Sequence, residues 1–460
     1  MHKISTIILA WWSWTRLWPI SRRYYPKQFL KLEELYGSSL FQKTLKRSLL
    51  LSKKEDILVV TNADYKYHCL TQASEIGIDL KESQILVEPK AKSTLNAIAY
   101  AMKWLKDTDL WLVLSSDAVI ENEDIFVDVV KKSCEQAIKS IVTFWIEPYC
   151  PHTWYGYIEA DKKWSKNYPY PVKNFKEKPN SETAKKFIKA WYYWNSWIFL
   201  FWKKIFWSEL KRYTPLIAKQ FDSKKTIEEI FENVPDLSID YWILEQSKSV
   251  YVSPLPIYWN DLWSFDAIDD DLARLWYENK NVISVESKNN FVLSETWAKK
   301  VALVWVEDVI VVDTKDALLV SKKWQSSKLK EVINILKSEQ SNLPDHWVTV
   351  YRPWWSYTII DDGPWFKSKR ITVLSWKKLS LQMHYHRSEH WVVVSWTATV
   401  TVWDKEYIVR KWESTFIRAW ERHRLENKWK IPLHIIESQI WDYLEEDDIV
   451  RYDDDFWRKS

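Results

Sequence analysis

Apolar and polar residues alternate with two different periods along the first 275 residues. Short runs rich in β-branched residues predict buried strands. These runs stand at 3–10, 56–62, 83–89, 110–117 and 140–148. Between them, the segments 93–107 and 181–190 carry apolar residues three or four positions apart, which predicts amphipathic helices. Because strands and helices alternate, we predict an α/β domain with a Rossmann-like mixed sheet and helices on both faces.

The pattern changes from about Asn281, where short strands follow one another without helices. These strands are predicted at 281–287, 289–295 and 299–313, and a lysine-rich amphipathic helix at 328–340. From about Trp347 onward the chain consists almost entirely of short strands with turn signals, which predicts a small barrel or double-sheet roll. The predicted parts are an α/β domain at 1–275, a β-rich connector with a linker helix at 276–343, and an all-β domain at 344–460.

The composition argues against several classes of protein. Lys and Arg total 66 and Asp and Glu total 62, so the net charge of +4, without a long basic block, does not indicate a nucleic-acid partner. The cysteines Cys69, Cys134 and Cys150 have no disulfide or metal-ligand spacing and fit a reducing compartment. No apolar stretch is long enough to span a bilayer. We therefore expect a cytoplasmic protein without a membrane partner.

Glycine is strongly depleted and tryptophan strongly enriched, since the 460 residues include 4 Gly and 34 Trp. An ordinary composition of roughly 7% glycine would supply about 30, which is close to the two counts together. Some bacterial lineages read the UGA codon as glycine, whereas a common alternative translation table reads it as tryptophan. We therefore hypothesise that most of these tryptophan letters stand for glycine. The alternative is a truly tryptophan-rich protein.

The segment "AWWSWTRLWPISR" shows what this substitution changes. Trp11, Trp12 and Trp14 follow directly after a predicted strand. With glycine at these positions the segment becomes a turn whose bare amides can donate to a phosphate group. Arg16 and Lys27 then supply charged donors for a polyphosphate. If the indoles are present as written, we expect them to fill this phosphate site.

Read with glycines, the whole segment through Phe29 resembles the sugar-1-phosphate nucleotidyltransferases. It resembles more closely the long bacterial mannose-1-phosphate guanylyltransferases that also carry a mannose-6-phosphate isomerase domain. Further motifs of that family follow in order: "EPKAKSTLNAIA", "LSSDAVI", "TWYGYIE", "FKEKP", "YYWNSWIF", "SIDYWILE" and "YWNDLWSF". The resemblance covers nearly the entire chain. It implies a nucleotidyltransferase domain, a short β-helix-like connector and a C-terminal cupin jelly roll.

The resemblance implies that the chain transfers GMP from GTP to mannose 1-phosphate, giving GDP-mannose and pyrophosphate. Arg16, Lys27, Asp117 and Asp261 would be catalytic, and the two aspartates would hold Mg²⁺. The substrate-binding positions it implies are Trp11, Trp12, Trp14, Thr15, Glu88, Gly156, Glu177, Lys178 and Asn195. Taken alone, Asp117 fits a turn carboxylate and Lys178 a solvated loop lysine equally well.

The same motifs sort the tryptophans into two groups. Trp18, Trp194 and Trp259 are expected to be true tryptophans. The motifs imply glycine, besides the three positions of the first turn, at Trp145, Trp154, Trp191, Trp197, Trp376, Trp396, Trp412 and Trp420.

The second chemical region lies in the all-β part, where five of the nine histidines fall between His384 and His434. Read with glycines, "WKKLSLQMHYHRSEHWVVVSW" has the spacing of a first cupin motif. This spacing assigns the metal ligands as Gln382, His384 and Glu389 in the first motif and His423 in the second. Alternate residues of a strand face the same side, so Gln382 and His384 can converge on one ion. The donors suit Zn²⁺ or another divalent metal.

Two histidines of this region stay open. His386 and His390 either lie on a surface, or one of them replaces a ligand. The resemblance implies that this domain interconverts hexose 6-phosphates, namely fructose 6-phosphate and mannose 6-phosphate, through an enediol. The residues leave the base unassigned, and candidates for the substrate phosphate are Arg424, Lys369 and Arg370.

The chain departs from the family pattern at Lys92 and Ser93 in the nucleotide segment and at Arg418 in the second cupin motif. Three hypotheses therefore remain. The first is a bifunctional enzyme. The second is a transferase whose cupin domain is structural or drives assembly of a homo-oligomer. The third is a non-catalytic sugar-phosphate-binding protein.

Overall fold

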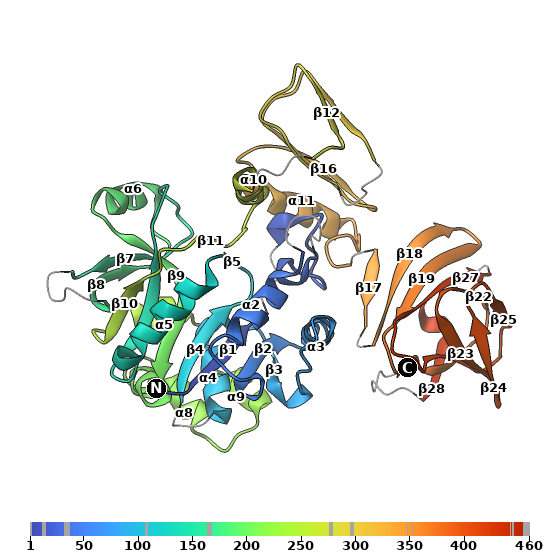
Figure 1. The fold of residues 1–460 in the computed structure, drawn as a ribbon, viewed down its shortest axis with the longest axis horizontal. Coiled ribbons are helices and arrows are strands. Elements are labelled where there is room, and N and C mark those ends of the chain that lie inside the picture. Colours follow the sequence, from blue (N-terminus) through green and yellow to red (C-terminus); the bar gives the residue numbers. More distant parts are fainter. Residues whose placement is uncertain are drawn as a thin grey trace. The chain divides into compact units, whose positions relative to one another are not determined.

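The chain folds into two compact units, Met1–Pro344 and Asp345–Ser460, shown in Figure 1. The computed structural model describes residues 2–11, 15–31, 37–105, 109–162, 168–275, 279–294, 299–346, 348–352, 354–441, 443 and 446–453. Trp12 and Trp14 of the predicted phosphate turn lie outside these residues.

A nine-stranded mixed sheet forms the centre of the first unit, in the order β3-β2-β1-β4-β9-β6-β10-β8-β7. Its strands are β1 (Ile4–Leu9), β2 (Ile57–Asn62), β3 (Ile85–Glu88), β4 (Leu110–Ser115), β6 (Ile141–Ile146), β7 (Tyr157–Ala160), β8 (Tyr170–Lys176), β9 (Tyr193–Trp202) and β10 (Val250–Pro254). β1 is parallel to β2 and β4, whereas β9 is antiparallel to β4 and β6. The five predicted strands are β1, β2, β3, β4 and β6, so the predicted mixed sheet is confirmed.

Helices cover both faces of this sheet because its central strands are apolar on both sides. On β4, Trp111 and Val113 belong to a core that includes residues of α4 and α7, whereas Leu110 and Leu112 belong to a core that includes residues of α5. The helices are α2 (Leu40–Ser48), α3 (Lys66–Glu75), α4 (Ser93–Trp104), α5 (Glu123–Ala137), α6 (Ser181–Lys189), α7 (Lys203–Tyr213), α8 (Pro215–Phe221), α9 (Ile227–Asn233) and α10 (Phe265–Arg274). α4 and α6 are the two predicted helices.

Short strands follow α10 and pair in the manner of a β-helix. β12 (Val282–Val285) is parallel to β14 (Val301–Val304), and β13 (Phe291–Ser294) is parallel to β15 (Val309–Asp313). β16 (Leu318–Lys322) then runs antiparallel to β15, and the linker helix is α11 (Leu329–Ser338). The sequence predicts one strand over 299–313, but the chain turns between β14 and β15, where Trp305 and Asp308 have positive φ.

The second unit is a double-sheet roll. One sheet has the order β17-β18-β19-β27-β22-β25, and the other has β24-β23-β26-β21-β28 with β20 beside β26. Their strands are β17 (Thr349–Tyr351), β18 (Trp355–Gly363), β19 (Phe366–Val373), β20 (Lys377–Lys378), β21 (Leu381–His384), β22 (Ser388–Ser395), β23 (Thr397–Val402), β24 (Lys405–Arg410), β25 (Ser414–Ile417), β26 (His423–Asn427), β27 (Leu433–Ile440) and β28 (Ile449–Asp453). The predicted all-β domain is confirmed.

Both sheets of this roll contribute to one core. Trp391 and Ile435 of the first sheet pack in one cluster with Val400 and Leu425 of the second. Alternating burial along β26 and β27 leaves every second side chain pointing inward. Among the residues that the structure describes, no helix combines the length and the apolar character needed to cross a bilayer.

Candidate active sites

A cavity of about 270 Å³ lies at the carboxyl ends of β1 and β4 in the first unit. Because these two strands are parallel neighbours, the loops that follow them open at the same edge of the sheet. The cavity is lined by Trp11, Arg16, Lys27, Asp117, Lys178 and Asp261, among other residues. All six are predicted site residues, and they come from segments far apart in the chain.

The short ribbon of β5 (Val119–Ile120) and β11 (Trp259–Asn260) brings the two predicted metal-binding aspartates to the same cavity. Asn260 pairs with Val119, so Asp117 and Asp261 lie just outside the ends of the ribbon. Lys27 joins them, because its Nζ is 3.1 Å from Asp117 Oδ2 and also donates to the backbone oxygen of Asp261. Lys27 is only 4% exposed, so the protein shields this ion pair from water.

Lys27 faces two carboxylates, and Arg16, which lines the same cavity, also interacts with Asp261. Burial, reinforced by the nearby Asp117 carboxylate, raises the pKa of Asp261 to about 6, although Lys27 acts in the opposite direction. Tyr155 donates its hydroxyl to Asp261 Oδ1 at 3.0 Å. Two converging carboxylates with a single ammonium group between them suit a divalent cation, and their oxygen donors fit Mg²⁺.

Arg16 belongs to a short 3-10 helix, Thr15–Leu17, that follows the predicted phosphate turn. Its guanidinium carbon lies 3.8 Å from the centre of the Trp154 ring and 5.8 Å from that of Trp263. Trp11, Trp154 and Trp263 all line the cavity. Indoles therefore line the space that the sequence predicts for a polyphosphate.

The predicted sugar-binding residues form a second cluster at this cavity, around Glu177 and Lys178. Lys178 Nζ is 3.1 Å from Glu177 Oε1, and Lys178 itself lines the cavity. A Cβ atom on Gly156 would stand 2.5 Å from Glu177 Oε2, so glycine is required there by packing. Asn195 donates its side-chain amide to Asp240 Oδ1 at 3.0 Å, and its backbone amide to the Gly156 oxygen at 2.8 Å.

Not all of the predicted sugar-binding residues reach the cavity. Among the described residues, Asp240 lines the cavity, whereas Glu177, Gly156 and Asn195 stand behind Lys178 and Asp240. Burial, together with the charge of Asp240, raises the pKa of Glu177 to about 8, and burial raises that of Asp240 to about 6. Both shifts favour the protonated carboxyl, which can donate a hydrogen bond to a sugar hydroxyl.

Glu88 is buried at the end of β3 and is not among the residues that line the cavity. Burial, with the nearby Asp236 charge, raises the pKa of Glu88 well above its usual range. Ser93 and Thr94, at the start of α4, line the cavity instead. The sequence reasoning named Ser93 only as a departure from the family pattern and gave no site role to Ser93, Thr94 or Tyr155, although all three belong to the quoted motifs.

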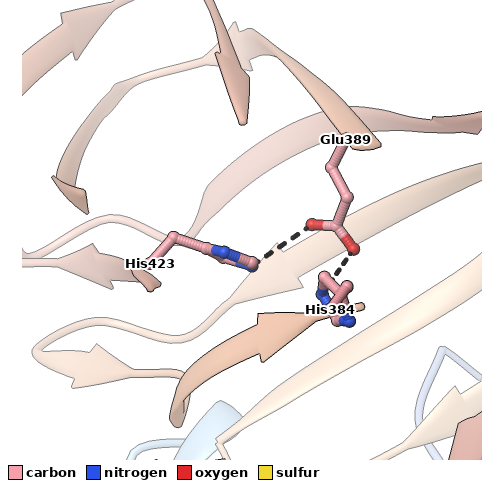
Figure 2. Close-up of side chains that lie close together, drawn as sticks. All are labelled: His384, Glu389 and His423. Carbon is pink, nitrogen blue, oxygen red and sulfur yellow. Dashed lines mark ion pairs between the residues drawn. The ribbon is translucent and has the colours of Figure 1, made fainter. Parts of the chain in front are cut away.

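The predicted cupin ligands converge between the two sheets of the second unit, as Figure 2 shows for three of them. His384 Nε2 lies 3.0 Å from Glu389 Oε1, and His423 Nε2 lies 3.5 Å from Glu389 Oε2. Ligand atoms of these three residues all lie within 4.8 Å of one another, and the residues are buried. Gln382 pairs with His423 across β21 and β26, with 3.4 Å between their Nε2 atoms.

The donors of this cluster fit a metal ion. His423 is oriented by a hydrogen bond between its Nδ1 and the Glu421 oxygen at 2.8 Å, which directs Nε2 inward. Burial lowers the pKa of His384 and so favours the neutral form that ligates metals. Burial alone would raise the pKa of Glu389, but the two imidazoles hold it well below its usual range. The set of two nitrogen donors and a carboxylate matches zinc-type chemistry.

The two histidines that the sequence leaves open, His386 and His390, are not part of the cluster. His386 Nδ1 lies 2.7 Å from Oδ1 of Asp448, the residue that directly precedes β28. His390 is on the same strand as Glu389 but one residue further, and its ring faces Phe416 on β25. Among the described residues, neither His386 nor His390 belongs to the metal-type cluster.

A second cavity, of about 30 Å³, opens beside Gln382 and Glu389. The described residues that line it include the cations Arg352, Lys369, Arg387 and Arg451. Arg370 points the other way on β19 and is exposed, and Arg424 pairs with Asp453. Of the phosphate candidates predicted from the sequence, only Lys369 therefore lines this cavity.

Two carboxylates are held side by side in this second cavity. The indole nitrogen of Trp391 donates to Glu389 Oε2 and to Glu437 Oε2, each at 3.1 Å, and Gln439 donates to both as well. Burial and the charge of Glu389 raise the pKa of Glu437 to about 7. Sequence reasoning missed Glu437 because it stands in an ordinary alternating strand.

Three family models match the chain. Residues 5–274 match the family described as "Nucleotidyl transferase", residues 280–336 match "MannoseP isomerase/GMP-like beta-helix domain", and residues 338–454 match "Mannose-6-phosphate isomerase C-terminal". The first and third of these families work with divalent metal ions.

Curated relatives match along their whole length. The xanthan biosynthesis protein XanB of Xanthomonas campestris pv. campestris (strain B100) is 38% identical, with 100% of both chains covered. The mannose-1-phosphate guanylyltransferase 2 of Escherichia coli O157:H7 is 37% identical, with 97% of each chain covered. The chain is thus similar to complete proteins of this kind and not to a single domain of them.

One solved structure supports the fold of the first unit. A protein of Thermus thermophilus, described as a mannose-1-phosphate geranyltransferase, superimposes with a TM-score of 0.63. The match covers 73% of this chain and 99% of that chain, at 24% identity.

Proposed function

The chain belongs to the mannose-1-phosphate guanylyltransferases that carry a C-terminal mannose-6-phosphate isomerase domain, and on this premise we propose how its two sites work. The enzyme transfers GMP from GTP to mannose 1-phosphate. A phosphate oxygen of the sugar attacks the α-phosphorus of GTP, pyrophosphate leaves, and GDP-mannose remains. The observation that supports this site is the cavity shared by Arg16, Lys27, Asp117 and Asp261.

The polyphosphate is proposed to bind where Arg16 and Lys27 face the cavity. Both side chains carry positive charge against the charge that develops on the α-phosphate and pyrophosphate. Asp117 and Asp261 would hold Mg²⁺, which would supply further positive charge to the triphosphate. Before substrate binds, Lys27 keeps the two aspartate segments together through its contacts to both. The positions Trp11, Trp12, Trp14 and Thr15 remain the proposed phosphate turn.

The sugar phosphate is proposed to bind beside Lys178, with Asp240 next to it. Lys178 offers an ammonium group to the phosphate, and Asp240 accepts a hydrogen bond from a sugar hydroxyl. Asn195 and Glu177 then position these two side chains, because Asn195 donates a hydrogen bond to Asp240 and Glu177 forms an ion pair with Lys178. Glu88 is proposed to help form the binding site for the nucleotide base, together with the segment that contains Ser93 and Thr94.

Release of pyrophosphate that depends on mannose 1-phosphate tests this function. With full-length protein purified from its native cell, GTP and Mg²⁺, we expect release that stops when either substrate is omitted, and slower release with ATP or UTP. Release that is equally fast without the sugar phosphate would contradict transfer to mannose 1-phosphate. Equal rates with all nucleoside triphosphates would contradict the preference for GTP.

The second unit favours a second function, the isomerisation of fructose 6-phosphate and mannose 6-phosphate. Two observations support it: the buried cluster of His384, Glu389 and His423, and the adjoining cavity lined by four cations. We propose that Lys369 binds the substrate phosphate and that the cluster, with Gln382, holds Zn²⁺ or another divalent ion. Such an ion would polarise the carbonyl and hydroxyl oxygens of the open-chain sugar.

Conversion of mannose 6-phosphate to fructose 6-phosphate by the metal-loaded full-length protein tests the second function. Lys369→Met is expected to raise KM at least about tenfold, because it removes one charge-assisted contact to the phosphate. Arg370→Met, one residue away and exposed, is the matched control and should leave KM unchanged. Trp355 lines the same cavity, and no conversion either by the unmodified protein or by Trp355→Gly with any divalent metal would instead support a structural cupin domain.

The remaining proposals follow from the same premise. The substrates, GTP and sugar phosphates, are cytoplasmic metabolites, which supports a cytoplasmic location. The boundaries 1–275, 276–343 and 344–460 remain our proposed division of the chain, and they are close to the ranges of the family matches.

A further inference from the structure

Nine tryptophans share a backbone conformation that L-residues rarely adopt. Among the described residues, seventeen non-glycine residues have a positive φ, and nine of them are tryptophan. These are Trp191, Trp197, Trp305, Trp324, Trp376, Trp396, Trp403, Trp412 and Trp420, with φ between 53° and 74°. Tryptophan supplies 34 of 460 residues, so about one such case would be expected, and a positive φ favours Asn, Asp or Gly over bulky residues.

One of these positions repeats a helix end that carries glycine elsewhere in the chain. At the end of α3, the amide of Gly77 donates to Ser74 and the next amide donates to Ala73, which is a Schellman motif with φ 76° at Gly77. At the end of α6, Trp191 occupies the equivalent position with φ 60°, and the same two hydrogen bonds are made to Ile188 and Phe187. Trp191 thus stands where this motif ordinarily has glycine.

The end of α11 has the same conformation without a tryptophan or a glycine. α11 ends in the same pair of hydrogen bonds, and there Gln340 has a φ of 57°. A side chain is therefore tolerated at this position. The inference rests on the recurrence of tryptophan in several kinds of turn and not on one helix end.

Two further positions are the third residue of tight turns. The amide of Glu413 donates to the Arg410 oxygen at 2.9 Å, and the amide of Glu421 donates to the Arg418 oxygen at 3.2 Å. The third residues of these turns are Trp412 and Trp420, with φ of 74° and 71°. A turn with positive φ at its third position is type II, which requires glycine or asparagine there.

The hairpin between β23 and β24 gives another kind of turn. Its loop has two residues, and the first, Trp403, has a φ of 55°. Two-residue hairpin loops with a positive φ at the first central residue take glycine, asparagine or aspartate there. A tryptophan at this place does not match the turn chemistry, and Trp403 is 52% exposed, with the Arg422 guanidinium carbon 5.9 Å from its ring centre.

Most of these nine tryptophans are exposed, unlike the tryptophans that the motifs predict to be genuine. Eight of the nine expose 41% to 80% of their surface, and Trp197 is half-buried. By contrast, Trp18, Trp194, Trp259 and Trp391 are 6%, 1%, 5% and 2% exposed, and none of them has a positive φ. The first three of these are the tryptophans that the motifs predict to be genuine. Backbone conformation therefore agrees with the motifs at six positions, whereas Trp145 and Trp154, which the motifs also assign to glycine, have no positive φ.

We infer that these nine positions are glycine in the polypeptide that the native cell makes. The motifs imply six of them, whereas Trp305, Trp324 and Trp403 are assigned by the backbone alone. The chemistry requires only that the cell decodes UGA as glycine at these codons and UGG as tryptophan at the buried ones. This inference stands apart from the proposed enzyme activities, because it uses no contact of either active site.

Peptide mass spectrometry of the protein purified from its native cell tests the inference directly. Peptides that contain positions 191, 305, 324, 403, 412 and 420 are expected to be lighter by the difference between tryptophan and glycine at each of them. Fragment ions of these peptides should place the full tryptophan mass at Trp194 and Trp391, and the peptide with Trp18 should retain it as well, so these three positions serve as internal controls. Tryptophan at 305, 324 and 403 would overturn the assignment made from the backbone.

A second measurement tests the physical reason in the full-length chain. The triple variant Trp403→Gly, Trp412→Gly and Trp420→Gly is expected to raise the calorimetric Tm of the second unit by roughly 10 °C, because three residues lose a left-handed strain. The matched triple alanine variant removes the same indoles but keeps each Cβ, so it should gain less than half as much. Equal gains for glycine and alanine would overturn the conformational argument.

Discussion

Lys27 and Asp117 form a buried ion pair, with 3.1 Å between Lys27 Nζ and Asp117 Oδ2. The two residues come from different segments, a 3-10 helix after β1 and the loop after β4. The pair lies against the cavity that we assign to the nucleotide, so any negative phosphate that enters must share this ammonium group with Asp117. Lys27 is thereby held in place before substrate binds, which lowers the cost of organising the site during the reaction.

Lys27→Met is expected to reduce kcat/KM for GDP-mannose formation by about 100-fold or more, because it removes one preorganised charge at the transferring phosphate. Circular dichroism should show an unchanged fold. Lys31→Met is the matched control, since Lys31 pairs with Glu75 at a partly exposed site, where an ion pair contributes little. Equal activity of the two variants would contradict a role for Lys27 in transfer.

Asp261→Asn is expected to raise the Mg²⁺ concentration for half-maximal transferase activity at least about tenfold, because an amide is a weaker ligand than a carboxylate. Titration of activity with Mg²⁺ at saturating GTP measures this shift. Asp128→Asn, on the exposed face of α5 where Asp128 pairs with Lys132, should leave the titration unchanged. An unshifted Mg²⁺ titration for Asp261→Asn would exclude Asp261 as a ligand.

Local signals in the sequence predicted most of the fold but not the contacts within the sites. The apolar run of β1 and the helical spacing of α4 are properties of neighbouring residues, and both elements lie where they are predicted. The contact between Lys27 and Asp117 depends on how distant segments pair, which spacing does not encode. The same holds for Asn195, which contacts Asp240 and does not reach the cavity.

The convergence of His384, Glu389 and His423 agrees with the spacing of the two cupin motifs, although the three residues lie on the separate strands β21, β22 and β26. Gln382 and His384 alternate on β21, and His423 faces Gln382 across the strand pair. The turn between β14 and β15 could not be predicted, because Trp305 counts as apolar and extends the apparent strand. A glycine at that position would have marked the turn in the sequence.

His423→Ala is expected to abolish tight binding of the cupin metal while leaving GDP-mannose formation unchanged. The variant removes one of the converging donors and leaves Glu389 with one imidazole partner. Metal content by mass spectrometry after dialysis, measured beside transferase activity, separates the two sites. His390→Ala, next to Glu389 but facing Phe416, should keep the metal. Full metal content in His423→Ala would contradict its assignment as a ligand.

His68 is expected to make the first unit less stable in acid. Burial lowers the pKa of His68 to about 4 from 6.5, although the Tyr24 carbonyl opposes this shift. The folded state therefore favours the neutral ring, so its contribution is complete above pH 6.5 and is lost as pH falls from 6.5 to 4. The full loss is about 3 kcal/mol.

Chemical denaturation of the parent protein and of His68→Gln at pH 7.5 and at pH 4 measures this contribution. The amide can still donate to the Tyr24 oxygen, which His68 Nε2 contacts at 2.9 Å. The parent should lose about 3 kcal/mol more than the variant between these pH values. An equal loss in both proteins would mean that His68 is not the group that titrates.

Trp355 is expected to limit the access of hexose phosphates to the second site. Its indole lines the cavity that also contains Lys369 and Glu437, and this cavity measures about 30 Å³. Such a space holds about two water molecules and not a sugar phosphate. Trp355→Gly should therefore strengthen the binding of fructose 6-phosphate to the metal-loaded protein at least about tenfold, as measured by isothermal titration calorimetry.

The neighbouring Trp354 supplies the control for this change. Its ring is covered by the Lys377 ammonium group, 4.1 Å from the ring centre, and among the described residues it is not part of the cavity wall. Trp354→Gly removes the same number of atoms one residue away and should leave the dissociation constant unchanged. If Trp355→Gly also leaves it unchanged while the Tm shows a folded protein, the hexose phosphate does not enter by this cavity. The cationic side chains around Lys369 would then have a role other than phosphate binding.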